Sequence, residues 1–375
     1  MASASVPAGA HRLSRDDARR LAVRAALLDA ERPGDVVEVA EQLLKIKIDP
    51  TATILTSEHA MLWARIGWSY DHPQLSKAVE IDRLLFEYDG TFRPISALPA
   101  MLPIMRTQPR YAKAREWFEQ NARFRTEVLA ALRDRGPLRA SEIDDTAQVA
   151  GVSESGWYGS NQVPRMLEAL MRRGDVAVVR REGRQKVWDL AERVFPADLP
   201  ELTLAEGEEE LQQRRLRAAG IARPKTNWAG VGLAGEPAVV DGVTGVWRVD
   251  PEALALLDDD PGGRVALLNP YDTTLFDRPR LRDLFGFDYT LEQFKPAAER
   301  RFGYFCYPIL VGERFVGQLD AAIDRSDDGA ALRVANIHET TPVGERGIDD
   351  EEWEMIRAEI RDLGEWLGIP VRGLE

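Results

Sequence analysis

The sequence predicts an α+β fold, because apolar residues follow helical spacing in some segments and strand spacing in others. Residues 14–31 show a helical apolar stripe that begins after Ser14, a suitable N-cap. Residues 304–311 and 314–324 are predicted to be two strands on either side of the turn Gly312-Glu313, which is typical of a β-hairpin. Further helices are predicted at about 35–45, 56–66 and 205–219 and at 349–367, the last beginning with acidic residues. Helices and antiparallel strands are therefore expected in the same chain.

The middle of the chain holds the clearest local pattern. A short helical signal at 138–144 is followed by a helix at 160–173 and by two strands within 176–190. This order of helix, helix and two-stranded ribbon is that of a winged helix, a variant of the helix-turn-helix. The Arg-rich segment 106–135 before it is predicted to form one long helix.

We expect three modules from the length of 375 residues and from this pattern. The first covers residues 13–105 and is winged-helix-like. The second covers residues 106–195 and joins the long helix to the winged helix. The third covers residues 200–375 and combines a winged-helix-like module with a C-terminal α+β part that contains the hairpin. The predicted class is thus α+β with tandem winged-helix modules.

Composition indicates a protein of a reducing compartment. Hydrophobic residues make up 44% and charged residues 30% of the chain, and no apolar run approaches the roughly 20 residues of a membrane span. The N-terminus lacks the apolar core of a secretory signal, and the single cysteine, Cys306, excludes an intramolecular disulfide. We expect a cytoplasmic, nucleoid-associated monomer without membrane contact.

The net charge of −13 argues against a nucleic-acid binder with a wholly basic surface, since affinity for DNA comes mainly from Lys and Arg at phosphates. Charges are screened over about 8 Å in physiological salt, so clustered cations still form a local binding surface. The alternative is a solvated surface or, for the hairpin, contact with another protein. The candidate DNA-binding residues are Arg106, Arg110 and Lys113 in the long helix, Arg180, Arg181, Arg184 and Lys186 in the hairpin, and Arg300 and Arg301.

The sequence offers no metal or nucleotide motif. Its four histidines lack the spacing of metal ligands, and one cysteine cannot form a thiolate cluster. The glycine-rich stretch 230–235 lacks the strand–turn–helix context of a dinucleotide site, and the sequence contains no Walker loop. We expect no cofactor and no metal.

Lys47-Ile48-Asp49 is a candidate for chemistry. On an extended chain, residues two apart point to the same side, so Lys47 and Asp49 are expected to project together while Ile46 and Ile48 face the core. Spacing alone favours a surface ion pair, which stabilises a fold by about 0–1 kcal/mol.

The residues around this tripeptide resemble a known family. In the AlkZ/YcaQ family of winged-helix DNA glycosylases, Gln-Φ-Gln or Gln-Φ-Asp precedes a segment like H-x-x-L-W-x-R-x-G, and this chain has LLKIKIDPTATILTSEHAMLWARIG (43–67), then LLFEY (84–88). The C-terminal motifs of the family resemble LLNPYDTTLFDRPRLRDLFGFDY (267–289) and ERRFGYFCYPILVGERFVGQLDAAIDR (299–325). Residues 138–260 are supported by pattern more than by motif.

The resemblance implies three tandem winged helices that form a concave scaffold for double-stranded DNA. It also implies an enzyme that hydrolyses the N-glycosidic bond of alkylated or crosslinked purines. By position, Lys47 and Asp49 occupy the places of the family's catalytic pair. His59 matches the histidine of the second motif and is a candidate for the substrate site, with a helix-packing histidine as the alternative.

Lys47 departs from the family pattern, in which the first member of the pair is glutamine. Glycosidic bond cleavage passes through an oxocarbenium-like transition state, which Asp49 would stabilise and a lysine cation would oppose. Three outcomes follow. Lys47 binds a phosphate while Asp49 performs the chemistry; the activity is lost or altered and a DNA-binding protein remains; or Lys47 attacks the sugar as a lyase nucleophile. The segment 89–94 also lacks the Trp-Ala-His that relatives often have after LLFEY.

Two other functions compete with that of a glycosylase. A non-catalytic winged-helix DNA-binding protein, acting as a regulator or damage sensor, would bind DNA in a salt-dependent way without releasing a base. A structural or protein-binding winged-helix array would have no affinity for DNA, and the net charge of −13 favours it.

Overall fold

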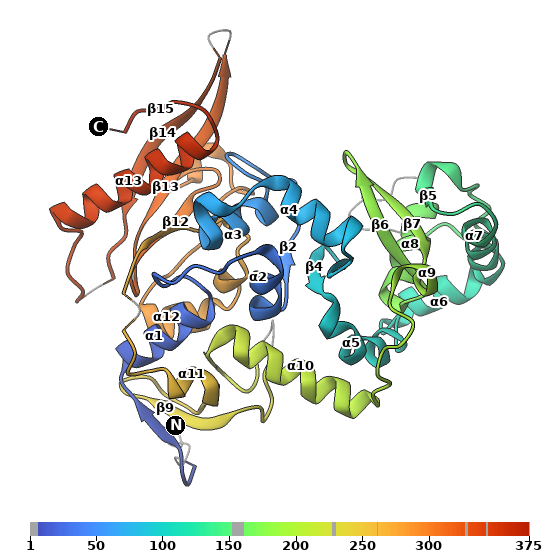
Figure 1. Cartoon of the computed structure of the whole chain (residues 1–375), viewed down its shortest axis with the longest axis horizontal. Helices are drawn as coiled ribbons and strands as arrows, with labels where there is room; N and C mark the ends of the chain where they lie inside the picture. The colour runs from blue at the N-terminus through green and yellow to red at the C-terminus, as the bar shows by residue number, and fades with distance from the viewer. Residues whose placement is uncertain are drawn as a thin grey trace. The chain divides into compact units, whose positions relative to one another are not determined.

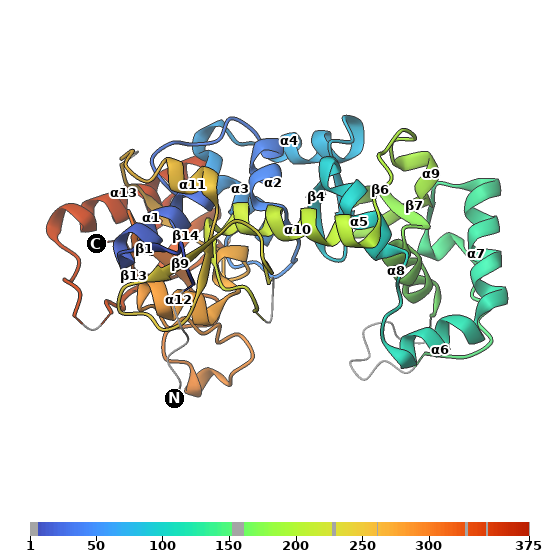
Figure 2. The same cartoon turned by 90° about the horizontal axis from the view of Figure 1, so that it is seen from below.

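The chain forms two compact units in the computed structural model (Figures 1 and 2). Unit 1 comprises Met1–His72 and Gln212–Glu375, and unit 2 comprises Pro73–Leu211. Helices and strands occur in both, so the α+β class is confirmed. The division into three winged-helix modules stays a prediction, and residues 13–105 contribute to both units. The structure describes residues 7–374 except 152–160, 227–229, 261, 327–328 and 343.

Capping residues fix the first helices of unit 1. Ser14 and Asp17 form a capping box at the start of α1 (Arg15–Ala25), where Ser14 Oγ accepts from the Asp17 backbone N at 3.0 Å. The helix is shorter than the predicted 14–31 because Leu27 has a positive φ of 57°. At α2 (Val36–Leu43) the Asp35 carboxylate accepts from the backbone N of Val37 at 2.8 Å and of Glu38 at 2.9 Å.

A short strand and a helix hold the Lys-Ile-Asp segment. β2 (Ile46–Lys47) is extended, as expected, and leads toward α3 (Ser57–Ile66). The helix ends at Gly67, whose φ of 71° few other residues adopt. The predicted helix at 56–66 is therefore confirmed.

Two β-sheets complete unit 1. The first has four strands in the order β1-β9-β10-β8, with β1 parallel to β9 and the other neighbours antiparallel. The second has five strands in the order β11-β12-β13-β14-β15, antiparallel except for β15, which is parallel to β14. The predicted hairpin around Gly312 joins β12 to β13. The strands are β1 (His11–Leu13), β8 (Ile221–Ala222), β9 (Glu236–Val240), β10 (Trp247–Val249), β11 (Val265–Leu267), β12 (Tyr307–Val311), β13 (Arg314–Ser326), β14 (Gly329–Glu339) and β15 (Val371–Arg372).

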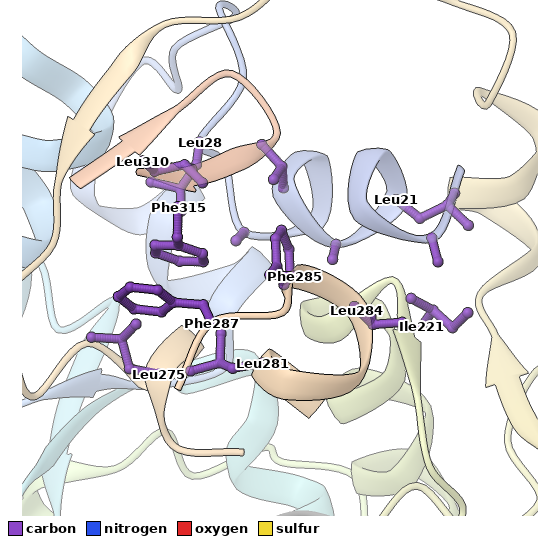
Figure 3. Packing of buried hydrophobic residues seen from close by; sticks show 14 of the residues in the cluster. Leu21, Leu28, Ile221, Leu275, Leu281, Leu284, Phe285, Phe287, Leu310 and Phe315 are labelled. Atoms are coloured by element: carbon purple, nitrogen blue, oxygen red, sulfur yellow. The ribbon is translucent and has the colours of Figure 1, made fainter. Parts of the chain in front are cut away.

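The main core of unit 1 joins segments from both ends of the chain. Figure 3 shows Leu21 of α1 in the same cluster as Phe285, the last residue of α12 (Arg278–Phe285), and Phe315 of β13. The Phe287 ring stacks on Phe315 with centroids 4.6 Å apart, and the Phe285 ring meets Phe315 edge-on at 5.2 Å. The N-terminal helix is thus buried by residues that come more than 200 positions later.

A fully buried ion pair connects two segments of unit 1. Arg65 of α3 and Asp272 are both 0% exposed, and the two guanidinium nitrogens meet the two carboxylate oxygens at 2.8 and 3.1 Å. Arg65 also donates to the backbone oxygens of Ala26 at 2.9 Å and Met61 at 3.0 Å, while Thr274 donates to Asp272. This bidentate pair therefore has the additional hydrogen bonds that a buried charge needs.

The remaining helices of the chain's C-terminal half agree largely with the sequence pattern. Asp349 caps α13 (Asp350–Trp366) by accepting from Glu352 N at 2.9 Å, and the predicted helix at 349–367 is confirmed. α10 (Leu204–Ala219) matches the helix expected at about 205–219, and α11 (Pro251–Ala255) follows β10.

In unit 2 the prediction of one long helix over 106–135 is wrong. Two helices, α6 (Ala112–Gln120) and α7 (Ala122–Arg135), meet at the buried Asn121. Its side-chain amide donates to the Trp117 backbone O at 2.9 Å, and its carbonyl accepts from the backbone N of Gln148 at 2.9 Å. An asparagine that bonds the backbone in this way competes with the helical hydrogen-bond pattern.

A helix and a hairpin form the rest of unit 2. α8 (Val163–Arg173) ends at Gly174, which has a φ of 82°, and the hairpin follows at once, as predicted. The expected helix at 138–144 is instead a strand followed by a single 3-10 turn, and the strand joins the hairpin in a sheet of order β5-β7-β6. The other elements are α4 (His72–Ser76), β3 (Leu85–Tyr88), β4 (Thr91–Pro94), α5 (Leu98–Met105), β5 (Leu138–Arg139), β6 (Val176–Glu182), β7 (Gln185–Leu190) and α9 (Ala191–Val194).

Within the described residues, no helix is long and apolar enough to cross a membrane. The same part of the chain contains no group of three or more His, Cys, Asp or Glu side chains positioned to hold a metal ion.

Candidate active site

Lys47 and Asp49 lie side by side at the surface of unit 1. Lys47 Nζ is 3.8 Å from Asp49 Oδ2, and the two side chains are 25% and 21% exposed. Lys47 Nζ also donates to the backbone oxygen of Ile48 at 2.5 Å. The backbone is held from α3, where Ser57 N donates to Asp49 O at 3.3 Å. The pair is therefore fixed by its surroundings but remains accessible to solvent.

Asp49 belongs to a polar group that we call the Asp49 cluster, which comprises Asp49, Thr51, Tyr271, Gln293 and Tyr304. Asp49 Oδ1 accepts from Thr51 N at 3.0 Å, and Gln293 Nε2 donates to Tyr271 Oη at 2.5 Å. Burial raises the pKa of the Tyr271 phenol, and the negative charge of Asp49 raises it further, whereas hydrogen bonds with Gln293 and Thr51 lower it. The Asp49 carboxylate thus shares its polar surroundings with a phenol and an amide.

Sequence reasoning identifies Asp49 but misses its neighbours. Tyr271 lies in the stretch LLNPYD and Tyr304 in the stretch ERRFGYF, yet no local pattern assigns either of them a role. More than 200 positions separate them from Asp49, and only the folded chain brings them together. The signal available in the sequence is that both tyrosines lie inside the segments that resemble the family's C-terminal motifs.

His59 contacts aromatic residues of unit 1. Its Nδ1 shares a hydrogen bond of 2.6 Å with Tyr70 Oη, and its ring lies 4.0 Å from that of His72. Trp366 stacks on Tyr70 and donates from Nε1 to the Tyr70 backbone O at 2.8 Å. Burial and the neighbouring His72 lower the pKa of His59 to about 4, so the ring is neutral at pH 7. These contacts favour the helix-packing role that was the alternative for this histidine.

Acidification is expected to destabilise the protein through His59. Between about pH 6.5 and 4 the unfolded chain protonates this residue and the folded chain does not, so the unfolded state binds more protons and stability falls with falling pH. The loss attributable to His59 between pH 7 and 5 is about 2 kcal/mol. Urea unfolding at the two pH values measures it. A His59→Gln variant should lose less stability over this interval; an equal loss in both proteins would contradict the assignment.

Two of the predicted DNA-binding cations are used inside unit 2. Arg181 meets the buried Glu87 at 2.8 Å, and Lys186 lies 3.0 Å from Glu87 and 2.5 Å from Glu168. Burial alone would lower the pKa of Lys186, but the two carboxylates raise it above its ordinary value. Arg181 and Lys186 therefore connect the β6–β7 hairpin to β3 and α8, and their charge is largely compensated within the protein.

The other predicted cations of unit 2 are at its surface. Arg184 is exposed at the hairpin turn, and Arg180 pairs with Glu182 at 2.6 Å. Arg106 and Arg110 are exposed between α5 and α6, and Lys113 is exposed in the first turn of α6. Where relatives often have Trp-Ala-His, the chain has the turn between β3 and β4, with Asp89 paired to Arg172 at 2.8 Å.

Arg300 and Arg301 lie in unit 1, and Arg300 contacts the Asp49 cluster. The Arg300 guanidinium is 5.0 Å from the ring centroid of Tyr304, a member of that cluster. Arg301 lies over the Phe302 ring at 4.7 Å and is exposed. Of the predicted phosphate-binding residues, Arg300 is the one with a described contact to a member of the Asp49 cluster.

Comparison with protein families gives a match that spans both site segments. The model of a family described as DNA glycosylase AlkZ-like matches residues 40–366, from before Lys47 to the end of α13. The chain belongs to the AlkZ-like DNA glycosylase family. The family resemblance of the sequence is thereby confirmed.

A solved structure supports the fold of this AlkZ-like protein. The Streptomyces sahachiroi DNA glycosylase AlkZ has a TM-score of 0.61 to it at 16% identity, over 96% of this chain and 99% of that one. At this identity the likeness concerns the fold. The AlkZ-like motifs themselves have a visible structural role, because the Arg65–Asp272 ion pair joins the segment LWARIG to the segment LNPYD.

Proposed function

We propose that this protein is a DNA glycosylase that hydrolyses the N-glycosidic bond of alkylated or crosslinked purines in duplex DNA, with Asp49 as the catalytic carboxylate. The observation that supports this most is the partly exposed Asp49, 21% accessible, in the middle of a polar cluster of an AlkZ-like chain. A purely structural carboxylate would be expected to resemble Asp272, which is buried and fully paired.

Cleavage of this bond does not require the protein to protonate the leaving base. An N-alkylated purine is already cationic, so the bond from C1′ to the base breaks with its electron pair going to the base, and positive charge develops on the sugar. A carboxylate facing that sugar stabilises the charge and accepts a proton from the water whose oxygen forms the new bond to C1′. Asp49 is the member of the cluster with the negative charge for both tasks.

In this mechanism Lys47 contacts a DNA phosphate and does not react. Its Nζ is already bonded to the Ile48 backbone O at 2.5 Å and lies 3.8 Å from Asp49 Oδ2, which is longer than a hydrogen bond. The Asp49 carboxylate therefore keeps an oxygen for substrate. Because a lysine stands where the family has glutamine, a non-catalytic DNA-binding protein is the second candidate function.

The proposal includes a DNA-binding scaffold of winged helices. The strand β5, the helix α8 and the β6–β7 hairpin follow one another as in such a module, and its wing presents Arg180 and Arg184 at the surface. Cations at the end of a hairpin suit contact with phosphates of double-stranded DNA.

Removal of the wing cations is expected to weaken DNA binding uniformly. Arg180→Ala with Arg184→Ala should lower the slope of log affinity against log salt by roughly 1 for each phosphate that is no longer neutralised, without changing preference for sequence. Fluorescence anisotropy at several salt concentrations measures this. Arg181 is left unchanged in this test. Its removal would leave the buried Glu87 without one of its ion-pair partners and could change the fold as well as DNA binding. An unchanged salt slope in the double variant would remove the wing from the DNA-binding surface.

The deciding experiment for the proposed function is base release. Wild-type protein is incubated with duplexes that contain one N-alkylated purine or one interstrand crosslink, and free base and abasic sites are measured. Release supports a glycosylase. Salt-dependent binding without release supports the non-catalytic DNA-binding protein.

A further inference from the structure

The segment between α12 and β12 of unit 1 exposes an aromatic ring beside the candidate site. The Phe294 side chain is 88% exposed, the highest value for a large apolar residue among those the structure describes. Figure 2 shows this orange segment extending beyond α12. Transfer of such a ring out of water is favourable, so a partner that covers it would gain free energy from its burial.

The exposed ring does not result from a loose loop. Glu292, which is buried, accepts from the backbone N of Arg301 at 2.8 Å and of Phe302 at 2.9 Å, and Lys295 Nζ donates to it at 2.7 Å. Lys295 N donates to Glu292 O at 2.9 Å and closes a turn around Phe294. The turn is therefore fixed at its base, and Phe294 occupies its tip.

The position of the turn relates it directly to the Asp49 cluster. Gln293, the residue before Phe294, donates to Tyr271 Oη at 2.5 Å, and Tyr271 is close enough to Asp49 to feel its charge. The residues that follow the ring supply cations, with Lys295 in the turn and Arg300 donating to the Lys295 backbone O at 3.0 Å. An exposed phenyl ring followed by basic residues matches a partner that is apolar inside and anionic outside, as a DNA duplex is.

We propose that Phe294 inserts between base pairs and fills the space left when the damaged nucleotide turns its sugar toward Asp49. This inference rests on the proposed function, since it takes the Asp49 cluster as the place of the damaged nucleotide. Apolar side chains are known to enter base steps as wedges, and enzymes that act on a base displace it from the stack. The ring compensates for the missing base stacking there, and Arg300, whose guanidinium bonds the Lys295 backbone O and no carboxylate among the residues that the structure describes, neutralises a neighbouring phosphate.

The test uses the full chain and a duplex with 2-aminopurine next to one N-alkylated purine. Wild-type protein is expected to raise the 2-aminopurine fluorescence on binding. Phe294→Ala should abolish the rise and slow base release from duplex roughly tenfold or more, while Phe294→Trp should keep both. Leu233→Ala is the matched control, because Leu233 is an 84% exposed apolar residue of unit 1 outside the cluster. Phe294→Ala should unfold as wild type does, since the ring packs against little.

The readouts separate this inference from the proposed function. Release without a dependence on Phe294, or an unchanged fluorescence rise in Phe294→Ala, overturns the insertion and leaves the glycosylase intact. A fluorescence rise that needs Phe294 but is followed by no base release supports the insertion and refutes the glycosylase. Wild-type protein that binds no duplex even in low salt overturns both and indicates a protein partner for the ring.

Discussion

An Asp49→Asn variant is expected to bind damaged duplex as wild type does and to release the base about 100-fold to 1,000-fold more slowly. The size of the effect is that of removing one preorganised group that stabilises charge in a transition state. Asparagine keeps an oxygen that can accept from Thr51 N, a bond of 3.0 Å in the native protein, so the local fold should not change. Single-turnover release of an N-alkylated purine measures the rate.

The matched control for this variant is Asp241→Asn. Asp241 is an exposed aspartate of unit 1 that pairs with Arg12 at 3.0 Å, so the change in total charge is the same. Full release by Asp49→Asn, or an equal loss in the control, would reject Asp49 as the catalytic carboxylate. Borohydride trapping with wild-type protein and Lys47→Gln tests the lyase outcome for Lys47, because only a lyase nucleophile would form an imine that is trapped on wild-type protein and not on the variant.

Arg65→Met is expected to lower the free energy of unfolding by about 3–5 kcal/mol, because it strands the buried Asp272 carboxylate without its partner. The backbone oxygens of Ala26 and Met61 would lose a donor at the same time. Urea unfolding followed by tryptophan fluorescence measures the change.

Two further variants give this prediction its controls. Arg333→Met removes an exposed arginine paired to Asp324 at 3.0 Å and should cost no more than about 1 kcal/mol. The double change Arg65→Met with Asp272→Leu should be less damaging than Arg65→Met alone, since no charge is left buried. If Arg65→Met costs as little as Arg333→Met, the pair does not stabilise unit 1 as proposed.

Local signals in the sequence predict most elements of this fold. Ser14, Asp35 and Asp349 cap helices at or next to the expected positions, because capping depends on a few neighbouring residues. The prediction of a long helix over 106–135 fails because Asn121 bonds to a loop that is distant in sequence. A helical stripe cannot reveal such a partner.

The candidate site, like the fold, is predicted only in part from the sequence. Asp49 is identified because a resemblance points to its tripeptide, while Tyr271 and Gln293 require the fold to bring them near it. For the cations of the β6–β7 hairpin, charge alone assigned a role to residues that the fold uses in another way. Arg181 and Lys186 are predicted to contact phosphates, but the structure pairs both with Glu87, a carboxylate from another hairpin that no local pattern links to them.

Unit 1 is built from the first and last parts of the chain, so the two units can complete their folding at different times during synthesis. Residues of unit 2 leave the ribosome as one uninterrupted stretch and can fold as soon as they have emerged. Leu21 and Arg65 must wait until Phe315 and Asp272 have been translated before their contacts can form. Until then, the apolar face of the N-terminal helix lacks the C-terminal residues that bury it in the folded protein.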